Sequence, residues 1–377
     1  MATIKHGNGT LGLGALSKDS GLHKVEIGRP ATGPNDVAVD IQFCGMCHSD
    51  LHATNGEWGI ESFPLIPGHE IAGVVREVGS KVTKFQVGDR VGVGCFVESC
   101  STCVECKRGE QNICRNGCCQ TYSSMYPEGK GHDECAGYHT NGGYSSNITV
   151  RDEFVLKLPD NLESHAAAPL LCAGITMFSP LNRHVLKGGK TRVGVVGFGG
   201  LGQTGVKIAK AMGCEVTVFS RSNSKKEAAE KLGAKLVAHS DEEALKAAAN
   251  SLEVILDTVA VPHDVNPIMA CLEPAGAYVC IGAIPQAMEI SPFALIVKNL
   301  QLEGSLVGGI PETQQMLEFC SKHNIAPDYK VIKASEANAQ FKALQDGTAA
   351  IGRAVIDMST LKDVMLTTES TNDPRVR

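Results

Sequence analysis

One stretch of sequence decides the fold: RVGVVGFGGLGQTGVKIAKAM, residues 192–212. It opens with an apolar run typical of a buried strand, Arg192–Val196, and its second half, Leu201–Met212, carries apolar side chains at helical spacing. Between them lies a G-x-G-x-x-G motif, formed by Gly197, Phe198, Gly199, Gly200, Leu201 and Gly202. Glycines here permit a tight turn and a close approach of the backbone to a pyrophosphate at the helix N-terminus. The stretch therefore predicts a dinucleotide site, with a merely structural loop as the alternative.

Strands and helices alternate after this stretch. Further strands are predicted at Glu215–Phe219, Lys235–Ala238, Glu253–Asp257 and Ala277–Ile281, with a polar helix over Lys225–Leu232. Such alternation is typical of a parallel, doubly wound sheet. The pattern changes near residue 310, where a helix (Glu312–His323) and a last strand (Ala354–Asp357) follow. We expect the chain to return there to its first domain.

The first part of the chain, up to about residue 160, is rich in glycine and in short strand-like runs. The runs are Val37–Ile41, Ile71–Val78 and Arg90–Val93. Turn signals such as VGDR at 87–90 separate them, which predicts an antiparallel, barrel-like β region. A chain of 377 residues is long for one core and predicts two domains. The last dozen residues are expected to form a disordered tail.

Composition excludes several classes of protein. Lys and Arg number 35 and Asp and Glu 41, so the net charge of −6 predicts no general affinity for nucleic acid or an anionic membrane. No apolar run approaches the roughly 18 residues of a membrane span. The N-terminus lacks the apolar core of a secretory signal, so we expect a cytoplasmic protein. There, fifteen cysteines indicate metal binding or catalysis rather than disulfides.

Two sets of residues are candidate metal ligands. The first has the spacing C-x2-C-x2-C-x7-C: Cys100, Cys103, Cys106 and Cys114. Four thiolates in a short loop can enclose a tetrahedral zinc with no open position, which is a structural site. An iron–sulfur cluster would need other spacings and a proline after the last cysteine. The second set is dispersed over Cys47, His69 with Glu70, and Cys172, and spacing alone does not join its members, because a lone buried cysteine is more often a small hydrophobe.

Several motifs resemble those of a known family. GHEIAGVV at 68–75, continuing to VG at 78–79 and GDRV at 88–91, resembles the signature of the zinc-containing medium-chain alcohol dehydrogenases. CHSDLH at 47–52, APLLCAGIT at 168–176 and GGIPET at 308–313 resemble its cinnamyl-alcohol-dehydrogenase branch, particularly the broad-specificity bacterial-type aldehyde reductases. The resemblance runs from about residue 10 to about residue 362.

This resemblance implies a GroES-like β-barrel catalytic domain in residues 1–165 and 308–377, and a Rossmann domain in residues 166–307. It also implies hydride transfer between a nicotinamide cofactor and a primary alcohol or its aldehyde, chiefly aldehyde reduction with broad specificity. Two zinc ions per chain and a homodimer are further implications.

The resemblance also assigns roles to single residues. Cys47, His69 and Cys172 become ligands of a catalytic zinc, and Glu70 becomes a carboxylate that can exchange with water or substrate on the metal. Asp50 is implied to orient the His69 ring, with a solvated turn carboxylate as the alternative.

Four further roles concern the proton and the cofactor. Ser49 and His52 match the inner and outer members of a proton relay, although His52 could be an ordinary turn histidine. Thr176 matches a residue at the nicotinamide half of the cofactor, and Arg353 matches an arginine near its phosphates.

The residues at the end of the second predicted strand indicate which nicotinamide cofactor the chain binds. NAD-binding folds place an acidic residue there, about 20 positions past the glycine motif, but this chain has SRSNSKK at 220–226. Hydroxyls and cations would bind a 2′-phosphate, so the segment predicts NADP(H); a solvated basic helix start is the alternative. The resemblance aligns Ser220, Ser222 and Lys225 with phosphate-binding positions, whereas Arg221 replaces a smaller residue.

Two other functions match parts of the sequence. A quinone or enone reductase of the same superfamily would lack the zinc chemistry, but all three candidate ligands are present. A zinc-ribbon module for nucleic acid is disfavoured by the acidic composition and the complete dinucleotide-binding unit. The sequence assigns no role to Cys118, Cys119 or Cys135, and it leaves Trp58 as either a pocket wall or a core residue.

Overall fold

The computed structural model describes residues 10–59, 62–125, 139–185, 190–284, 286–349 and 352–365. The chain separates into two compact units. The first comprises Met1–Cys172, Gly309–Ser321 and Asp328–Arg377, and the second comprises Ala173–Gly308 and Lys322–Pro327. The functional domain boundaries proposed from the sequence differ from these units in the short segments 166–172 and 322–327 and at Gly308. Cys135 and the tail predicted to be disordered lie outside the described residues.

The first unit is built on a β-sheet in which most neighbours are antiparallel. Its strand order is β16 (Tyr329–Lys333), β17 (Arg353–Asp357), β3 (Asp36–Gly45), β4 (Ile71–Val78), β5 (Arg90–Val93) and β9 (Leu156–Lys157). Strand β8 (Asn147–Arg151) also pairs with β3. Two smaller sheets pair β1 (Thr10–Ala15) with β2 (Leu22–Ile27) and β6 (Phe96–Glu98) with β7 (Cys119–Gln120). The helices of this unit are α1 (His48–Thr54), α2 (Val104–Lys107), α3 (Ser164–Ala167), α10 (Ile310–Lys322) and α11 (Ala337–Gln345).

Strand β3 brings distant segments together at one end of this sheet. It is ten residues long and ends at Gly45, two residues before Cys47. Because β3 and β4 are antiparallel, this end lies beside the start of β4, where the Gly45 N–H donates to the Glu70 carbonyl at 2.9 Å. A Cβ at Gly45 would lie 2.0 Å from a Glu70 carboxylate oxygen, so only glycine leaves room for that side chain. On the other side, the Met46 N–H donates to the carbonyl of Ala354 in β17 at 2.9 Å.

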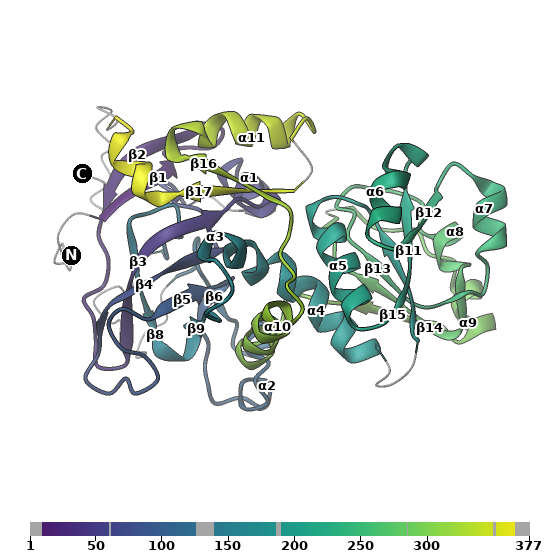
Figure 1. The fold of residues 1–377 in the computed structure, drawn as a ribbon, viewed down its shortest axis with the longest axis horizontal. Helices are drawn as coiled ribbons and strands as arrows, with labels where there is room; N and C mark the ends of the chain where they lie inside the picture. The colour runs from purple at the N-terminus through teal and green to yellow at the C-terminus, as the bar shows by residue number, and fades with distance from the viewer. Residues whose placement is uncertain are drawn as a thin grey trace. The chain divides into compact units, whose positions relative to one another are not determined.

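The second unit contains a parallel sheet in the order β12 (Lys235–Ala238), β11 (Glu215–Ser220), β10 (Arg192–Val196), β13 (Leu252–Asp257), β14 (Leu272–Cys280) and β15 (Gln301–Gly304). The helices that accompany it are α4 (Ala173–His184), α5 (Gly200–Ala211), α6 (Lys226–Lys231), α7 (Glu242–Ala247), α8 (Asn266–Met269) and α9 (Pro292–Lys298) (Figure 1). The strand order reverses between β10 and β13, which is the switch point where such sheets bind ligands.

The predicted fold class is confirmed: an antiparallel β unit accompanies a doubly wound parallel sheet. Apolar side chains dominate the core of the parallel sheet, and Phe219, Ile255 and Tyr278 are fully buried there. The cysteines of the described residues are free thiols. Among those residues, no helix combines the length and apolar character needed to cross a bilayer.

Candidate metal and cofactor sites

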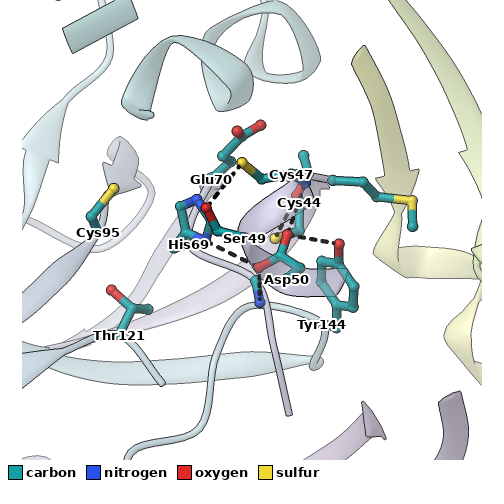
Figure 2. Close-up of polar contacts among 12 residues, drawn as sticks. Cys44, Cys47, Ser49, Asp50, His69, Glu70, Cys95, Thr121 and Tyr144 are labelled. Atoms are coloured by element: carbon teal, nitrogen blue, oxygen red, sulfur yellow. Dashed lines mark hydrogen bonds and ion pairs between the residues drawn. The ribbon is translucent and has the colours of Figure 1, made fainter. Parts of the chain in front are cut away.

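A buried carboxylate, Asp50, organises the end of β3. Its oxygens accept hydrogen bonds from the backbone N–H groups of Cys47 (2.9 Å) and Gly68 (3.0 Å) and from the Tyr144 hydroxyl (3.0 Å). The Nδ1 atom of His69 lies 3.0 Å from the same carboxylate (Figure 2). When Nδ1–H donates to Asp50, the other ring nitrogen, Nε2, keeps its lone pair for a metal. The structure therefore places Asp50 where it would orient a histidine ligand, and not in a solvated turn.

The dispersed candidate ligands converge beside this carboxylate. Cys47, His69, Glu70 and Cys172 each offer a donor atom, and these atoms all lie within 4.8 Å of one another. Cys172 reaches the cluster from the residue directly before α4. A hydrogen bond with Cys172, together with the Arg353 charge, holds the pKa of Cys47 well below its usual range. Two sulfurs, one imidazole nitrogen and a nearby carboxylate are a donor set that suits zinc with one exchangeable position.

Glu70 and Arg353 add a second charged pair to the cluster. Glu70 is fully buried, and neither of its carboxylate oxygens has a hydrogen-bond partner among the described residues. Burial raises the pKa of Glu70 to about 8, against the lowering effect of Arg353, whose guanidinium lies 3.6 Å away. Buried carboxylate oxygens without partners fit a neighbouring cation. The structure places Arg353 beside the metal-ligand cluster; its contact with cofactor phosphates stays a prediction.

The two relay candidates lie on α1, three residues apart. The Ser49 hydroxyl is 3.6 Å from the Cys47 sulfur, and His52 Nδ1 is 2.6 Å from a carboxylate oxygen of Glu57. His52 and Glu57 are partly exposed. The Trp58 ring stands 4.9 Å from the His52 ring, centroid to centroid, and Trp58 is 49% exposed, so the interpretation of Trp58 as a core residue is wrong.

Three residues of this region were missed by the sequence analysis: Glu57, Tyr144 and Cys95. Tyr144 is 94 residues from Asp50, so no spacing connects them. Cys95 lies near His69 in Figure 2, and a hydrogen bond with Cys172 lowers its pKa. No sequence signal distinguished Cys95 from the other cysteines. Glu57 could have been found from the sequence, because it is an acidic residue only five positions after His52.

The four-cysteine loop has the geometry of a closed metal site. The Sγ–Sγ distances are 3.9 Å for Cys100–Cys106 and 4.0 Å for Cys103–Cys114. A tetrahedral zinc with Zn–S bonds of about 2.3 Å requires Sγ–Sγ distances of about 3.8 Å. Backbone N–H groups of Thr102 and Cys103 point at the Cys100 sulfur and lower its pKa to about 5. The sulfurs are thus arranged for a metal with no open position.

The glycine motif forms the predicted cradle between β10 and α5. Gly197 has φ +88°, and a Cβ at Gly202 would lie 2.1 Å from the Gly197 carbonyl oxygen. A Cβ at Gly199 would meet none of the described residues within 4 Å, so the turn is open above the helix N-terminus. Phe198 is buried beneath the turn. The unpaired N–H groups of the first turn of α5 fit a pyrophosphate.

The basic segment after β11 adjoins this turn. The Lys225 ammonium donates to the Phe198 carbonyl at 3.0 Å, and the Ser222 hydroxyl accepts from the Ser224 N–H. Arg221 is exposed and Ser220 ends β11. Hydroxyl and cationic groups therefore gather beside the phosphate cradle. Thr176 lies in α4, in the same unit as the cradle, and its contact with a nicotinamide stays a prediction.

The chain is similar to known oxidoreductases over nearly its whole length. Two family models match it: the alcohol dehydrogenase GroES-like domain over residues 33–160 and the zinc-binding dehydrogenase over residues 200–322. NADP-dependent alcohol dehydrogenase C 1 of Mycolicibacterium smegmatis is 45% identical over 350 residues, which are 92% of this chain and 97% of that protein. 8-Hydroxygeraniol dehydrogenase of Catharanthus roseus is 43% identical over 362 residues, 95% of this chain and 98% of that protein. A solved cinnamyl alcohol dehydrogenase from Sorghum bicolor has a TM-score of 0.86 and 38% identity, covering 96% of this chain and 100% of that one.

The two donor clusters predict two zinc ions in unlike roles. Cys103→Ser should impair folding, because a closed structural site contributes folding free energy. Cys172→Ser should preserve the fold, reduce the zinc content from two ions per chain to one and abolish turnover. Elemental analysis and circular dichroism of the purified variants measure these outcomes. One zinc or none in fresh, unchelated wild-type protein would contradict the prediction.

Asp50→Asn should weaken binding of the second zinc about 10- to 100-fold, the usual effect of removing a hydrogen-bond partner of a metal ligand. The amide nitrogen would face hydrogen-bond donors that now meet a carboxylate oxygen, so some of the contacts that orient His69 would be lost. Competition with a chelator measures the affinity. Asp40→Asn is the matched control, because Asp40 lies in β3, in the same unit, but pairs with Arg76 at the surface. Equal zinc affinity in the two variants would show that Asp50 does not hold the ligand.

Proposed function

The chain belongs to the zinc-binding alcohol dehydrogenase family, and from that premise we propose that it works chiefly as an aldehyde reductase of broad specificity. Its activity is hydride transfer between NADP(H) and an alcohol or the matching aldehyde, with zinc and NADP(H) as cofactors. The observation that carries this function is the convergence of Cys47, His69 and Cys172 around one point, with Glu70 beside them.

The residues present fit both cofactors. Bound zinc would supply Lewis acidity to a substrate oxygen, and Cys47, His69 and Cys172 would hold it. Asp50 keeps the His69 ring in the orientation and tautomer that a ligand needs. Glu70, close enough to the same point, can occupy or leave the exchangeable position. A zinc-independent quinone reductase would have no use for this donor set.

The proton path runs along α1. Ser49 is adjacent to the Cys47 sulfur, so its hydroxyl can receive the proton of a substrate alcohol or return it to the product of aldehyde reduction. His52 lies one turn further on, and its contact with the partly exposed Glu57 gives the proton an exit to solvent. We add Glu57 to the relay as its outermost member.

The names of two similar enzymes support a substrate class. The alcohols they name, 8-hydroxygeraniol and cinnamyl alcohol, are both primary and both carry a hydroxyl on a carbon that adjoins a carbon–carbon double bond. The carbon skeletons differ, which supports a site that selects the reacting group more than the skeleton. We therefore propose primary, unsaturated alcohols and their aldehydes as substrates, and the cytoplasm as the location.

A homodimer is proposed from the surface of the second unit. Helix α9 exposes Phe293 (75%), Ile296 (75%) and Val297 (63%), and β15 is the edge strand of the parallel sheet. Leu302 and Leu306, in and after β15, are also exposed. An apolar helix face beside an open strand edge is typical of a surface covered by another chain. A two-fold axis would bring the same patch of a second copy against it.

Turnover should depend strongly on Ser49 and less on His52. Ser49→Ala should lower kcat about 100-fold, the usual scale for a positioned proton transfer, while His52→Ala should cost less because water can replace the outer member. Initial rates between pH 6 and 9, with zinc content measured in parallel, test this. Near-full activity of Ser49→Ala over that range would exclude the relay.

Preference for NADPH should reside in the segment after β11. One good hydrogen bond to a charged group contributes about 1.5–3 kcal/mol, which corresponds to a preference of about ten- to a hundredfold. Arg221→Asp should remove most of it by repulsion as well as by lost contact. Lys231→Asp is the control, because it makes the same charge change at the far end of α6. Equal kcat/KM for NADH and NADPH in the wild-type enzyme would refute the assignment.

A further inference from the structure

A second buried carboxylate, Asp257, lies at the carboxyl end of β13 and takes no part in the sites described above. It is 2% exposed. Its Oδ2 atom accepts a hydrogen bond from the Tyr278 hydroxyl (2.9 Å), and its Oδ1 atom accepts one from the Val259 N–H (3.0 Å). The Nε2 atom of His263 forms an ion pair with Oδ2 at 3.1 Å. The carboxylate therefore connects β14 with the loop that follows β13.

This loop, Thr258–Asp264, borders the phosphate cradle and forms neither helix nor strand. The Thr258 hydroxyl donates to the Val196 carbonyl at 2.7 Å, and a Cβ at Gly197 would lie 2.7 Å from that hydroxyl oxygen. The segment that selects the 2′-phosphate follows β11, on one side of β10, and the loop follows β13 on the other side. A dinucleotide lying across the switch point therefore meets this loop with its nicotinamide half.

Both ring nitrogens of His263 lie against oxygen atoms that can only accept hydrogen bonds. Nδ1 lies 2.9 Å from the Val261 carbonyl oxygen, which can only accept, so Nδ1 carries a hydrogen. The other nitrogen, Nε2, is buried 3.1 Å from a carboxylate oxygen that also only accepts, and it makes no hydrogen bond with a described residue. A neutral ring would bring the Nε2 lone pair close to the negative carboxylate, which is unfavourable. The contact is favourable only while Asp257 and His263 share one proton, on the imidazole or on the carboxyl group.

The other groups around this pair do not replace that proton. Tyr278 and Cys280 reach Asp257 from β14, and burial raises the pKa of both, so both stay neutral. Asp264 adds a negative charge near His263. The Nε2 atom of His239, the residue after β12, lies 3.2 Å from the Asp264 carbonyl oxygen. Burial raises the pKa of Asp257, which also favours retention of the shared proton.

We propose that Tyr278, Asp257 and His263 form a proton-dependent latch that holds the loop Thr258–Asp264 in the conformation that binds the nicotinamide half of NADP(H). These are positioning residues, and the inference rests on the proposed cofactor. The latch is closed while the pair holds its proton and opens as pH rises and the proton is lost. If the loop then has its NADPH-binding conformation in only about a tenth of the molecules, the Kd for NADPH rises about tenfold.

Asp257→Asn isolates the proton. An amide at this position donates one N–H to Nε2 of a neutral His263, and its oxygen still accepts from the Val259 N–H. The Tyr278 oxygen can accept the second amide hydrogen. This variant keeps the contacts of His263 and Val259 without a titrating proton, so it should bind NADPH like the wild type at pH 6 and show no latch opening at higher pH.

The experiment is a fluorescence titration of the zinc-loaded enzyme with NADPH between pH 6 and 9. The ratio of wild-type Kd to Asp257→Asn Kd should rise about tenfold with pH. Titration of the 2′-phosphate affects both proteins equally and cancels in the ratio. His263→Ala should bind NADPH about tenfold more weakly than the wild type at pH 6, and the difference should disappear by pH 9.

A constant wild-type to Asp257→Asn ratio across this range would overturn the latch, and so would wild-type affinity of His263→Ala at pH 6. If Asp257→Asn does not fold, the ratio of the His263→Ala Kd to the wild-type Kd for NADPH provides the same test. A ratio that does not change with pH excludes a shared proton. A wild-type enzyme that binds no NADPH at any pH would instead refute the proposed function.

Discussion

The metal-ligand cluster of this protein depends on one buried carboxylate. A charge in the core is tolerated only when it is fully hydrogen-bonded, and Asp50 meets four donors from three separate segments of the chain. Those contacts fix the segment before α1 against the segment before β4. The antiparallel pairing of β3 and β4 makes this possible, since it places the end of one strand beside the start of the next. Ligand orientation, proton path and the close packing of Glu70 on Gly45 all follow from this arrangement.

The two units divide the chemistry between them. The first contains both donor clusters, which differ in whether a bound metal would have an open coordination position. Four sulfurs enclose one point in the first cluster, whereas two sulfurs and an imidazole leave room for Glu70 or another ligand in the second. The second contains the phosphate cradle and the basic segment that would read the cofactor. Each unit also buries a carboxylate that organises a loop, Asp50 in one and Asp257 in the other. In both, a histidine ring nitrogen lies close to that carboxylate, at 3.0 Å for His69 and 3.1 Å for His263.

Local sequence patterns predicted most of the fold. Strands β4, β5, β10 and β12 have the predicted limits, because apolar runs bounded by turn residues define them. Strand β15 was not predicted, since QLEG is short, polar and exposed, as an edge strand can be. Strand β14 begins at Leu272, five residues before the predicted start. The additional residues include Ala275, whose backbone φ is positive, as is rare within a strand.

The closed cysteine site could be predicted from the spacing of its cysteines alone. The dispersed site could not, because Cys47, His69 and Cys172 meet only through strand pairing, and no period in the sequence records that. The family resemblance joined these three residues, whereas the positions of Tyr144 and Cys95 beside them became evident only from the structure.

The central claim is that the dispersed donors bind a zinc ion of their own. Anomalous diffraction at the zinc absorption edge, from crystals grown without added metal, tests it most directly. The account predicts two peaks in each chain, one enclosed by the four-cysteine loop and one among Cys47, His69 and Cys172. A peak in the loop with none among the dispersed donors would contradict it.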